Sequence, residues 1–235
     1  MTLILHYHPL SSFCWKALIA LRENGSPFET RMVNFGDPEA KAAFAALWPT
    51  AKIPLLEDDG RIVPETSIII EYIDQRHPGS VRLLPEDPEE RLEVRLWDRI
   101  FDLHVSSPMQ GFVAQHLRPE GERDARTLDE SLAGLATAYD MIEDRFGDRS
   151  WAGGGSFSMA DCAAAPALFY AATILPFPPG SHTLTGYFER LMERPSVERT
   201  IAEARPFFPY FPLRDAIPHR FLADRHEAGA RVSAS

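Results

Sequence analysis

The sequence predicts an α/β domain followed by an all-α domain, and three observations support this division. Short apolar runs typical of strands alternate with helical patterns only over residues 1–82. An acidic, proline-bounded linker occupies residues 83–88. Over residues 89–205 no strand pattern survives, and apolar side chains recur at the spacing of helices packed on one face. Residues 206–235 are predicted to form a C-terminal tail.

The expected elements of the first domain follow the order βαβ, then α, then ββα. A crossover helix requires its two strands to be parallel, whereas the last two strands form a hairpin, so the arrangement is thioredoxin-like. The first helix is apolar on almost every side except at Lys16, which predicts burial on several sides. The expected strands are Leu3–Leu5, Phe28–Phe35, Ile53–Leu56 and Arg61–Val63, and the expected helices are Phe13–Arg22, Asp37–Leu47 and Thr66–Arg76.

Only helices are expected in the second domain. Their patterns cover Glu89–Val105, Arg123–Phe146, Ser158–Ala172, His182–Arg194 and Ser196–Ala204. The tail begins with an aromatic, proline-rich stretch, Pro206–Pro212, and is polar after it. We expect this tail to lie over the surface and to cover apolar side chains of the helical domain.

Composition excludes several classes of partner. The chain has 235 residues, of which 45% are apolar and 25% charged, as in soluble globular proteins. The formal net charge is −10, so we expect neither nucleic acid nor an anionic membrane as a partner, although a local basic pocket for a small anion is compatible with it. The first residues lack the basic region of a signal peptide, and the longest apolar run, Ala163–Leu175, is too short to cross a bilayer.

The cysteines and histidines predict neither a disulfide framework nor a metal site. Cys14 and Cys162 are the only cysteines and lie far apart in sequence, which favours the reducing cytoplasm. His6 and His8 alternate on the predicted first strand. A metal ion would need further ligands that the sequence does not place, so we expect none.

Two serines, Ser11 and Ser12, stand between the first strand and the buried helix. A helix N-terminus attracts anions, and a hydroxyl there can donate a hydrogen bond to a thiolate. Each unit by which a thiol pKa falls below about 8.5 requires roughly 1.4 kcal/mol of anion stabilisation. A charge-assisted hydrogen bond and a helix N-terminus together supply about that much. The alternative, which position alone favours, is that one serine only caps the helix.

The pair Ile53-Pro54 precedes a strand of the hairpin. Proline there would cost the ladder a donor unless it marks a bend, and such bends are often cis. A cis bond would turn the Ile53 backbone outward, where it can pair with an extended peptide ligand. The alternative is an ordinary proline of an edge strand.

Two further pairs begin helices. At Glu65-Thr66, a carboxylate, a hydroxyl and unpaired N–H groups can hold both charged ends of an amino-acid group. A routine helix start with Thr66 as the cap is an equal alternative. Ser158 and Asp161 fit a capping box, with aspartate in place of the usual Glu or Gln, and we interpret this pair as structural.

Taken together, four segments resemble the cytosolic glutathione transferase family. They are His8–Trp15, Trp48–Pro54, Pro64–Tyr72 and Phe157–Asp161, and in order and spacing they span the chain from Leu3 to about Arg205. The resemblance implies a thioredoxin-like domain that binds glutathione and a helical domain that shapes the second-substrate pocket. The leading serine resembles the serine-type classes, such as theta and zeta.

The resemblance also implies the roles of residues at the start of the first helix. Ser11 matches the catalytic serine, with Ser12 as the close alternative, and we expect the Ser12 hydroxyl to cap the helix. Cys14 lies where redox relatives carry a resolving or replaced cysteine. Because there is no Cys-x-x-Cys motif, disulfide exchange is disfavoured, and we expect Cys14 to pack inside the helix.

Contacts to glutathione are implied at two places. Ile53, before a cis Pro54, resembles the residue whose backbone pairs with the cysteinyl part, and Lys52 fits a contact to the glycyl carboxylate. Glu65 and Thr66 resemble the pair that holds the γ-glutamyl end.

The implied activity is conjugation of glutathione, the cosubstrate, to an apolar electrophilic small molecule by a homodimeric enzyme of detoxification. The alternatives are a glutathione-dependent isomerase, dehalogenase or ether-cleaving enzyme, or a non-catalytic glutathione- or partner-binding module. Asp98 and Asp102 share one face of the long fourth helix. We expect that face to be solvated or paired with another helix rather than to serve a second substrate.

Overall fold

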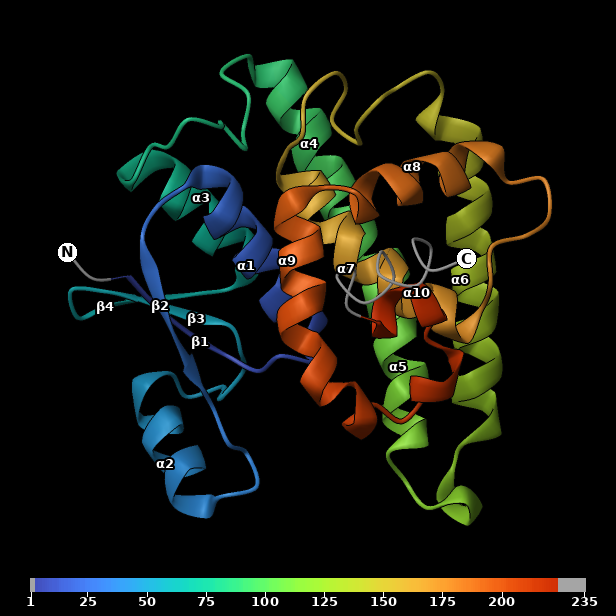
Figure 1. The fold of residues 1–235 in the computed structure, drawn as a ribbon, viewed down its shortest axis with the longest axis horizontal. Helices are drawn as coiled ribbons and strands as arrows, with labels where there is room; N and C mark the ends of the chain where they lie inside the picture. Colours follow the sequence, from blue (N-terminus) through green and yellow to red (C-terminus); the bar gives the residue numbers. More distant parts are fainter. Residues whose placement is uncertain (1–2, 224–235) are drawn as a thin grey trace, which may run out of the picture.

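The computed structural model describes residues 3–223, which form an α/β domain and a helical domain packed side by side (Figure 1). The first domain contains a four-stranded sheet in the order β2-β1-β3-β4. Its strands are β1 (Leu3–Tyr7), β2 (Phe28–Met32), β3 (Leu55–Asp58) and β4 (Arg61–Pro64). β1 runs parallel to β2 and antiparallel to β3, and β3 and β4 form the predicted hairpin. The thioredoxin-like topology is therefore confirmed.

Helices cover both faces of this sheet. They are α1 (Ser12–Asn24), α2 (Pro38–Leu47) and α3 (Thr66–Arg76). In Figure 1, α1 and α3 lie on one side of the sheet, with α1 next to the helical domain, whereas α2 lies on the other side. Phe44 of α2 is buried against Val33 and Leu55 there.

Helix α1 is buried on two sides, as its apolar pattern predicts. Leu18 and Leu21 pack in the core beneath the sheet, whereas Trp15 and Ile19 belong to the core of the helical domain. The helix ends at Gly25, which adopts a left-handed φ of 82° and donates its N–H to Leu21 O. Because α1 joins both cores, its N-terminus has a fixed position at the border of the domains.

The helical domain begins with a longer helical stretch than the sequence predicts. The expected helix ends at Val105, but a π-helical segment, η1 (Phe101–Ser106), connects α4 to α5 without a break. A π turn shifts the helical register. The apolar spacing after η1 is therefore out of phase with that of α4, and the sequence pattern does not show that the helix continues into α5. The helices are α4 (Pro88–Ile100), α5 (Ser107–His116), α6 (Ala125–Phe146), α7 (Met159–Ile174), α8 (His182–Met192) and α9 (Pro195–Ala204). Within residues 3–223, no helix has both the length and the apolarity needed to cross a bilayer.

The segment after α9 is more deeply packed than a surface tail. It folds into short helices, η3 (Arg205–Tyr210), η4 (Arg214–Ala216) and α10 (His219–Leu222). Phe208 is buried, with its ring 5.9 Å from that of Phe169, and Phe221 lies 5.2 Å from the same ring. These aromatic side chains complete the helical-domain core. The predicted tail also includes residues 224–235, which lie outside the described residues.

Candidate active site

A cleft of about 600 Å³ opens between the two domains. Its walls come from the segment before β3, the first turns of α3, and α4 with η1. The cleft brings together all the residues that the resemblance assigns to glutathione contacts, namely Lys52, Ile53, Pro54, Glu65 and Thr66.

A smaller hollow of about 470 Å³ lies next to this cleft and shares Ile53 with it. Ser11 lines the hollow, and most of the other side chains there are apolar. The apolar side chains include Leu10, Met32, Val33 and Phe35, and the polar ring of His8 is also part of the lining. Burial lowers the pKa of His8, which favours the neutral form of its ring. The hollow therefore offers an uncharged, mainly apolar surface beside a hydroxyl.

Ser11 is the N-cap of α1. Its Oγ accepts a hydrogen bond from the N–H of Cys14 at 3.3 Å, and its own N–H donates to His8 O at 3.0 Å. A hydroxyl that accepts one bond still has its proton to donate. Ser11 can therefore cap the helix and also donate to an anion at the helix N-terminus, so the two interpretations of this serine are compatible.

Ser12 does not cap α1, and that expectation was wrong. It is the first residue of the helix and is buried, and its Oγ accepts a hydrogen bond from Nε2 of Gln110 on α5 at 3.2 Å. Ser12 lines neither the cleft nor the hollow. Its hydroxyl therefore links the two domains, through a partner that is 98 residues away in sequence.

Cys14 packs inside α1, as expected. Its side chain is fully buried, and burial raises the pKa of the thiol to about 12 against weaker opposing contacts from the Ser11 hydroxyl and the His8 backbone. Cys162 is also buried as a free thiol, and burial raises its pKa well above the ordinary value. Neither cysteine provides a thiolate at neutral pH.

The Ile53–Pro54 peptide bond is cis. In the part of the chain that the structure describes, no hydrogen bond occupies the Ile53 N–H or carbonyl group. Lys52 is exposed and forms no ion pair with any described residue. A backbone donor and acceptor and a neighbouring cation therefore stand at the cleft with no partner among residues 3–223.

Glu65 has an unusual backbone conformation at the start of α3. Its φ is 66°, a left-handed value that costs a non-glycine residue about 1–3 kcal/mol and occurs mostly at functional sites. Glu65 occupies the N-cap position but makes no capping bond with its exposed side chain. Thr66, the alternative cap, is instead the first residue of the helix and is buried. The carboxylate and the first N–H groups of α3 thus face the same cleft.

Lys16 belongs to a buried charge network that the sequence analysis missed. Its side chain is 1% exposed, and its Nζ lies 2.6 Å from Oδ1 of Asp98 and 2.8 Å from Oδ2 of Asp102. The face that carries Asp98 and Asp102 is therefore paired with another helix, α1, which was one of the two expected arrangements, and is not solvated. Burial raises the pKa of Asp102, Lys16 opposes this effect, and the Asp98 charge adds to it. A single lysine in an otherwise apolar helix was the available signal, because a buried cation requires a nearby acid.

The same network includes the start of α3. Ser67 Oγ donates to Asp98 at 2.7 Å and accepts from Lys16 at 3.0 Å, and Arg99 contacts Ser67, Asp98 and Asp102. Three helices, α1, α3 and α4, therefore meet through charged hydrogen bonds. This fixes the helix start that carries Glu65 beside the cleft.

Asp161 anchors the N-terminus of α7. Its carboxylate accepts hydrogen bonds from the N–H groups of Ser158 and Ala152, at 2.8 and 2.9 Å, and from the Tyr187 hydroxyl at 2.7 Å. It also accepts one from the Ser158 hydroxyl at 2.9 Å, and it is fully buried. These contacts tie the central helix to the loop before it and to α8.

Comparison with protein families gives two matches. Residues 5–81 match the N-terminal domain, and residues 125–219 the C-terminal domain, of glutathione S-transferase. The chain is 27% identical to glutathione S-transferase F13 of Arabidopsis thaliana over 177 residues, which cover 72% of this chain and 80% of that protein. It is 36% identical to a probable maleylacetoacetate isomerase of Caenorhabditis elegans over 92 residues, which cover 39% and 42% of the two chains.

Solved structures agree with these matches. A glutathione S-transferase from Methylobacillus flagellatus, solved with glutathione bound, superposes with a TM-score of 0.77 at 27% identity. The superposition covers 84% of this chain and 98% of that one. The two family matches together span more than half of the sequence. This chain belongs to the glutathione S-transferase family of enzymes.

Proposed function

We propose that this enzyme binds glutathione in the cleft and conjugates its sulfur to an apolar electrophile held in the hollow beside Ser11. The position of Ser11 carries the proposal. It caps a buried helix at the point where the cleft and the hollow share Ile53. A thiolate at that point would lie beside a hydroxyl donor and a helix N-terminus.

Groups without a partner in the described structure match the ends of glutathione. The Glu65 carboxylate fits the γ-glutamyl ammonium, and the Thr66 hydroxyl with the first N–H groups of α3 fits the adjoining carboxylate. The Ile53 backbone fits the cysteinyl peptide unit, and Lys52 fits the glycyl carboxylate. These contacts would place the sulfur toward Ser11, because Ile53 lines both the cleft and the hollow.

In the proposed reaction the thiol proton leaves to solvent and the Ser11 hydroxyl donates a hydrogen bond to the thiolate. Ser11 does not need to take the proton, because it acts by stabilising the anion. The thiolate sulfur then attacks the electrophile, a carbon–sulfur bond forms, and the leaving group departs with its electron pair. The apolar lining of the hollow favours an electrophile with an apolar body.

Calorimetric titration with glutathione, followed by assays with aryl halides, epoxides and activated alkenes, tests this function. We expect saturable binding and a stable thioether product with at least one electrophile class. Binding without any turnover would instead favour the non-catalytic module, and no binding would exclude both functions.

A second candidate is glutathione-dependent isomerisation, because one of the relatives is a probable maleylacetoacetate isomerase. In such a reaction the same thiolate would add to the carbon–carbon double bond, the resulting single bond would rotate, and elimination would break the carbon–sulfur bond, restore the double bond and release the thiolate. The fate of glutathione separates the two reactions. Conjugation consumes one glutathione per turnover, whereas isomerisation of a cis-configured unsaturated diacid leaves its concentration unchanged.

We also propose that the enzyme is a homodimer. Leu92, Leu96 and Leu103 lie along one side of α4 and η1, Ile68 lies on α3, and each of these side chains is more than half exposed. Exposed apolar residues grouped in this way are typical of a protein–protein contact. Because Ile68 and Leu103 also line the cleft, a partner there would border the glutathione site.

The cytoplasm is the compartment that we propose. Both cysteines of the chain are buried free thiols, as expected of a protein from a reducing environment. Fractionation of the producing cells tests this proposal. Recovery of the protein in the membrane or secreted fraction would contradict it.

A further inference from the structure

A turn before α1 brings a second polar side chain to the hollow that Ser11 lines. The Ser11 N–H donates to His8 O at 3.0 Å, which closes a turn over residues 8–11. His8 and Ser11 therefore stand at the two ends of one turn, and both side chains line the same hollow. The reaction proposed above uses Ser11 for the thiolate and gives His8 no role.

The proton of the His8 ring is placed by the same turn. Its Nδ1 accepts a hydrogen bond from the N–H of Leu10 at 3.2 Å. An imidazole nitrogen that accepts a hydrogen bond carries no proton, so the neutral ring has its proton on Nε2. Burial favours this neutral form because it lowers the pKa of His8. Among residues 3–223, none accepts a hydrogen bond from Nε2, which leaves this N–H for a ligand in the hollow.

Neighbouring groups hold this ring and its turn in place. The His8 ring meets Phe207 of η3 edge to face, with 6.3 Å between the ring centroids. The indole N–H of Trp15, which is buried in α1, donates to Pro9 O at 2.6 Å. A donor that is fixed before the reaction needs no reorganisation when negative charge develops beside it. The Nε2–H group of His8 meets this condition.

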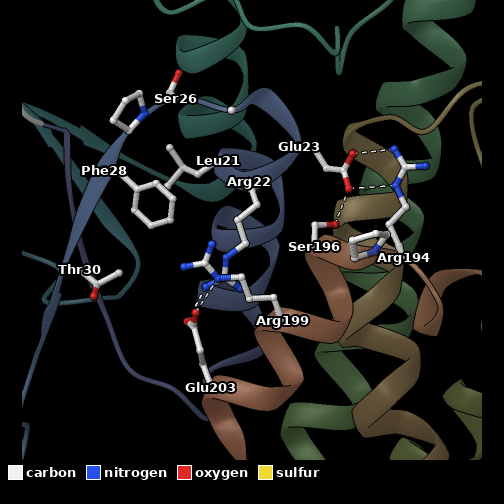
Figure 2. Close-up of a pocket in the computed structure, with 13 residues that line it drawn as sticks. Leu21, Arg22, Glu23, Ser26, Phe28, Thr30, Arg194, Ser196, Arg199 and Glu203 are labelled. Carbon is white, nitrogen blue, oxygen red and sulfur yellow. Dashed lines mark hydrogen bonds and ion pairs between the residues drawn. The ribbon is translucent and has the colours of Figure 1, made fainter. Parts of the chain in front are cut away.

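The far end of α1 is anchored as well (Figure 2). Arg22 donates to the Glu203 carboxylate of α9 at 2.5 Å. Arg194, the residue before α9, holds Glu23 through two hydrogen bonds, at 2.9 and 2.6 Å. These contacts restrict any shift of α1 along or about its axis. The turn that leads into the helix is therefore held in one arrangement.

The lining of the hollow strengthens such a donor. None of the described residues that form it is an acid, a lysine or an arginine, and most of the side chains are apolar. Apart from Ser11 and His8, the polar side chain of the lining is Asn34. Asn34 is exposed, and its Oδ1 already accepts the N–H of Gly36 at 3.0 Å. An N–H group acts more strongly on a developing anion in such surroundings than in water.

We propose that His8 is a second catalytic donor of this enzyme, whose Nε2–H binds the oxygen that becomes negative when glutathione adds to an α,β-unsaturated carbonyl compound. This inference rests on the function proposed above and names its class of electrophile. In a closed turn the first and fourth Cα atoms are less than about 7 Å apart, so Ser11 and His8 can both reach one small substrate.

In the proposed step the thiolate sulfur attacks the β carbon, and a carbon–sulfur bond forms. The electron pair of the carbon–carbon double bond moves to make an enolate, whose negative oxygen accepts the hydrogen bond from His8. A proton from solvent then adds to the α carbon, which balances the thiol proton lost at the start and restores the carbonyl group. His8 keeps its own proton throughout. An electrophile that loses a halide from a saturated carbon forms no such oxygen anion.

Two variants of His8 separate donation from structure. His8→Asn keeps an acceptor for the Leu10 N–H but has no group at the position of Nε2, whereas His8→Gln places an amide N–H there. The readout is the kcat for 4-phenyl-3-buten-2-one divided by the kcat for benzyl chloride. This ratio should fall at least about tenfold in His8→Asn and be largely restored in His8→Gln. The KM for glutathione should not change, because the donor acts only in the transition state.

His219→Asn is the matched control. His219 is exposed on α10, outside the hollow, and this variant should keep the ratio of the unaltered enzyme. An unchanged ratio in His8→Asn would overturn the proposal, as would a ratio in His8→Gln as low as that in His8→Asn. Turnover of benzyl chloride without turnover of the ketone would also overturn it, and would leave the function proposed above intact. Turnover of neither electrophile would contradict that function and this proposal together.

Discussion

Ser11 caps α1 and, in the proposed function, would also stabilise the thiolate. Its Oγ accepts the Cys14 N–H, which satisfies one of the orphan donors at the start of α1. Its hydroxyl proton is then available to an anion in front of the helix. Cys14, one turn later, cannot compete as a nucleophile because burial raises its pKa to about 12. At the residue scale, the proposed chemistry therefore depends on Ser11 being the hydroxyl that lines the hollow.

Ser11→Ala should raise the pKa of bound glutathione and slow turnover at neutral pH, while its affinity for glutathione changes little. A hydrogen bond to a charged group contributes about 1.5–3 kcal/mol, so turnover should fall roughly tenfold or more. The pH dependence of thiolate absorbance in the glutathione complex measures the shift. Ser12→Ala is the control and should keep the low pKa, because Ser12 bonds to Gln110 instead. If Ser12→Ala loses the low pKa and Ser11→Ala keeps it, the assignment is wrong.

Glu65→Ala should weaken glutathione binding by at least about 1.5 kcal/mol, as expected when a charged hydrogen bond is lost. Calorimetry gives the change in affinity, and circular dichroism shows whether the fold is intact. Glu39→Ala removes an exposed acid from the first turn of α2, outside the cleft, and should leave binding unchanged. If Glu65→Ala and the unaltered enzyme bind glutathione with equal affinity, the γ-glutamyl end does not bind at Glu65.

At the scale of elements, short polar contacts fix how helices meet the sheet. Asp58, at the end of β3, accepts hydrogen bonds from the Tyr72 hydroxyl at 2.8 Å and from His77 Nε2 at 2.7 Å, and so ties α3 to the hairpin. Lys16 ties α1 to α4 through Asp98 and to η1 through Asp102. These links hold the helices that shape the cleft in one arrangement.

The Asp58 link should make stability depend on pH in the acid range. Burial alone would raise the pKa of Asp58, but the hydrogen bonds from His77 and Tyr72 prevail and lower it below 3.8. The ionised carboxylate therefore stabilises the fold above that pH, and this stability is lost as the pH falls through the lowered pKa. Asp58→Asn should lower the free energy of unfolding by about 1 kcal/mol at pH 6, with a smaller difference at pH 3 and below.

Urea unfolding from pH 6 down to the acid limit of the native state measures this dependence. Asp140→Asn, at an exposed position on α6, is the control and should follow the unaltered protein at every pH. A constant difference between Asp58→Asn and the unaltered protein would show that the carboxylate charge does not matter.

For the whole molecule, the main feature is an apolar face on α3, α4 and η1 that a single chain leaves exposed to water. Four large apolar side chains of this face are exposed to water, namely Ile68, Leu92, Leu96 and Leu103. The opposite side of α4 buries its apolar residues in the core, as an amphipathic helix normally does. A second copy that buries this face would also bring its surface to the border of the cleft. Assembly and catalysis would then share residues.

Light scattering at micromolar concentration should therefore give twice the chain mass of 26.4 kDa. Leu96→Arg should shift the mass to that of the monomer, because a charge in the centre of an apolar contact has to be desolvated. Leu117→Arg, at an even more exposed leucine on the far end of α5, should remain dimeric. A monomeric mass for the unaltered protein would exclude the dimer.

Local patterns determined much of this protein. The alternation of strands and helices, the capped start of α2 at Asp37, the bounds of α3 and the cis bond before Pro54 all follow from neighbouring residues, because turns, caps and amphipathic faces are local. The double-sided apolar pattern of α1 likewise predicts its place between two cores. The family resemblance rests on these same segments.

Only the tertiary structure decided which polar groups meet. Lys16 finds Asp102 at a separation of 86 residues, Ser12 finds Gln110 at 98, and Arg22 finds Glu203 at 181. Helical periodicity assigns a side chain to a face but does not identify the partner opposite that face. For a buried charge or hydroxyl, however, the partner determines both its energy and its role. For this reason Ser12 was misplaced, and Lys16 was not identified as the partner of Asp98 and Asp102.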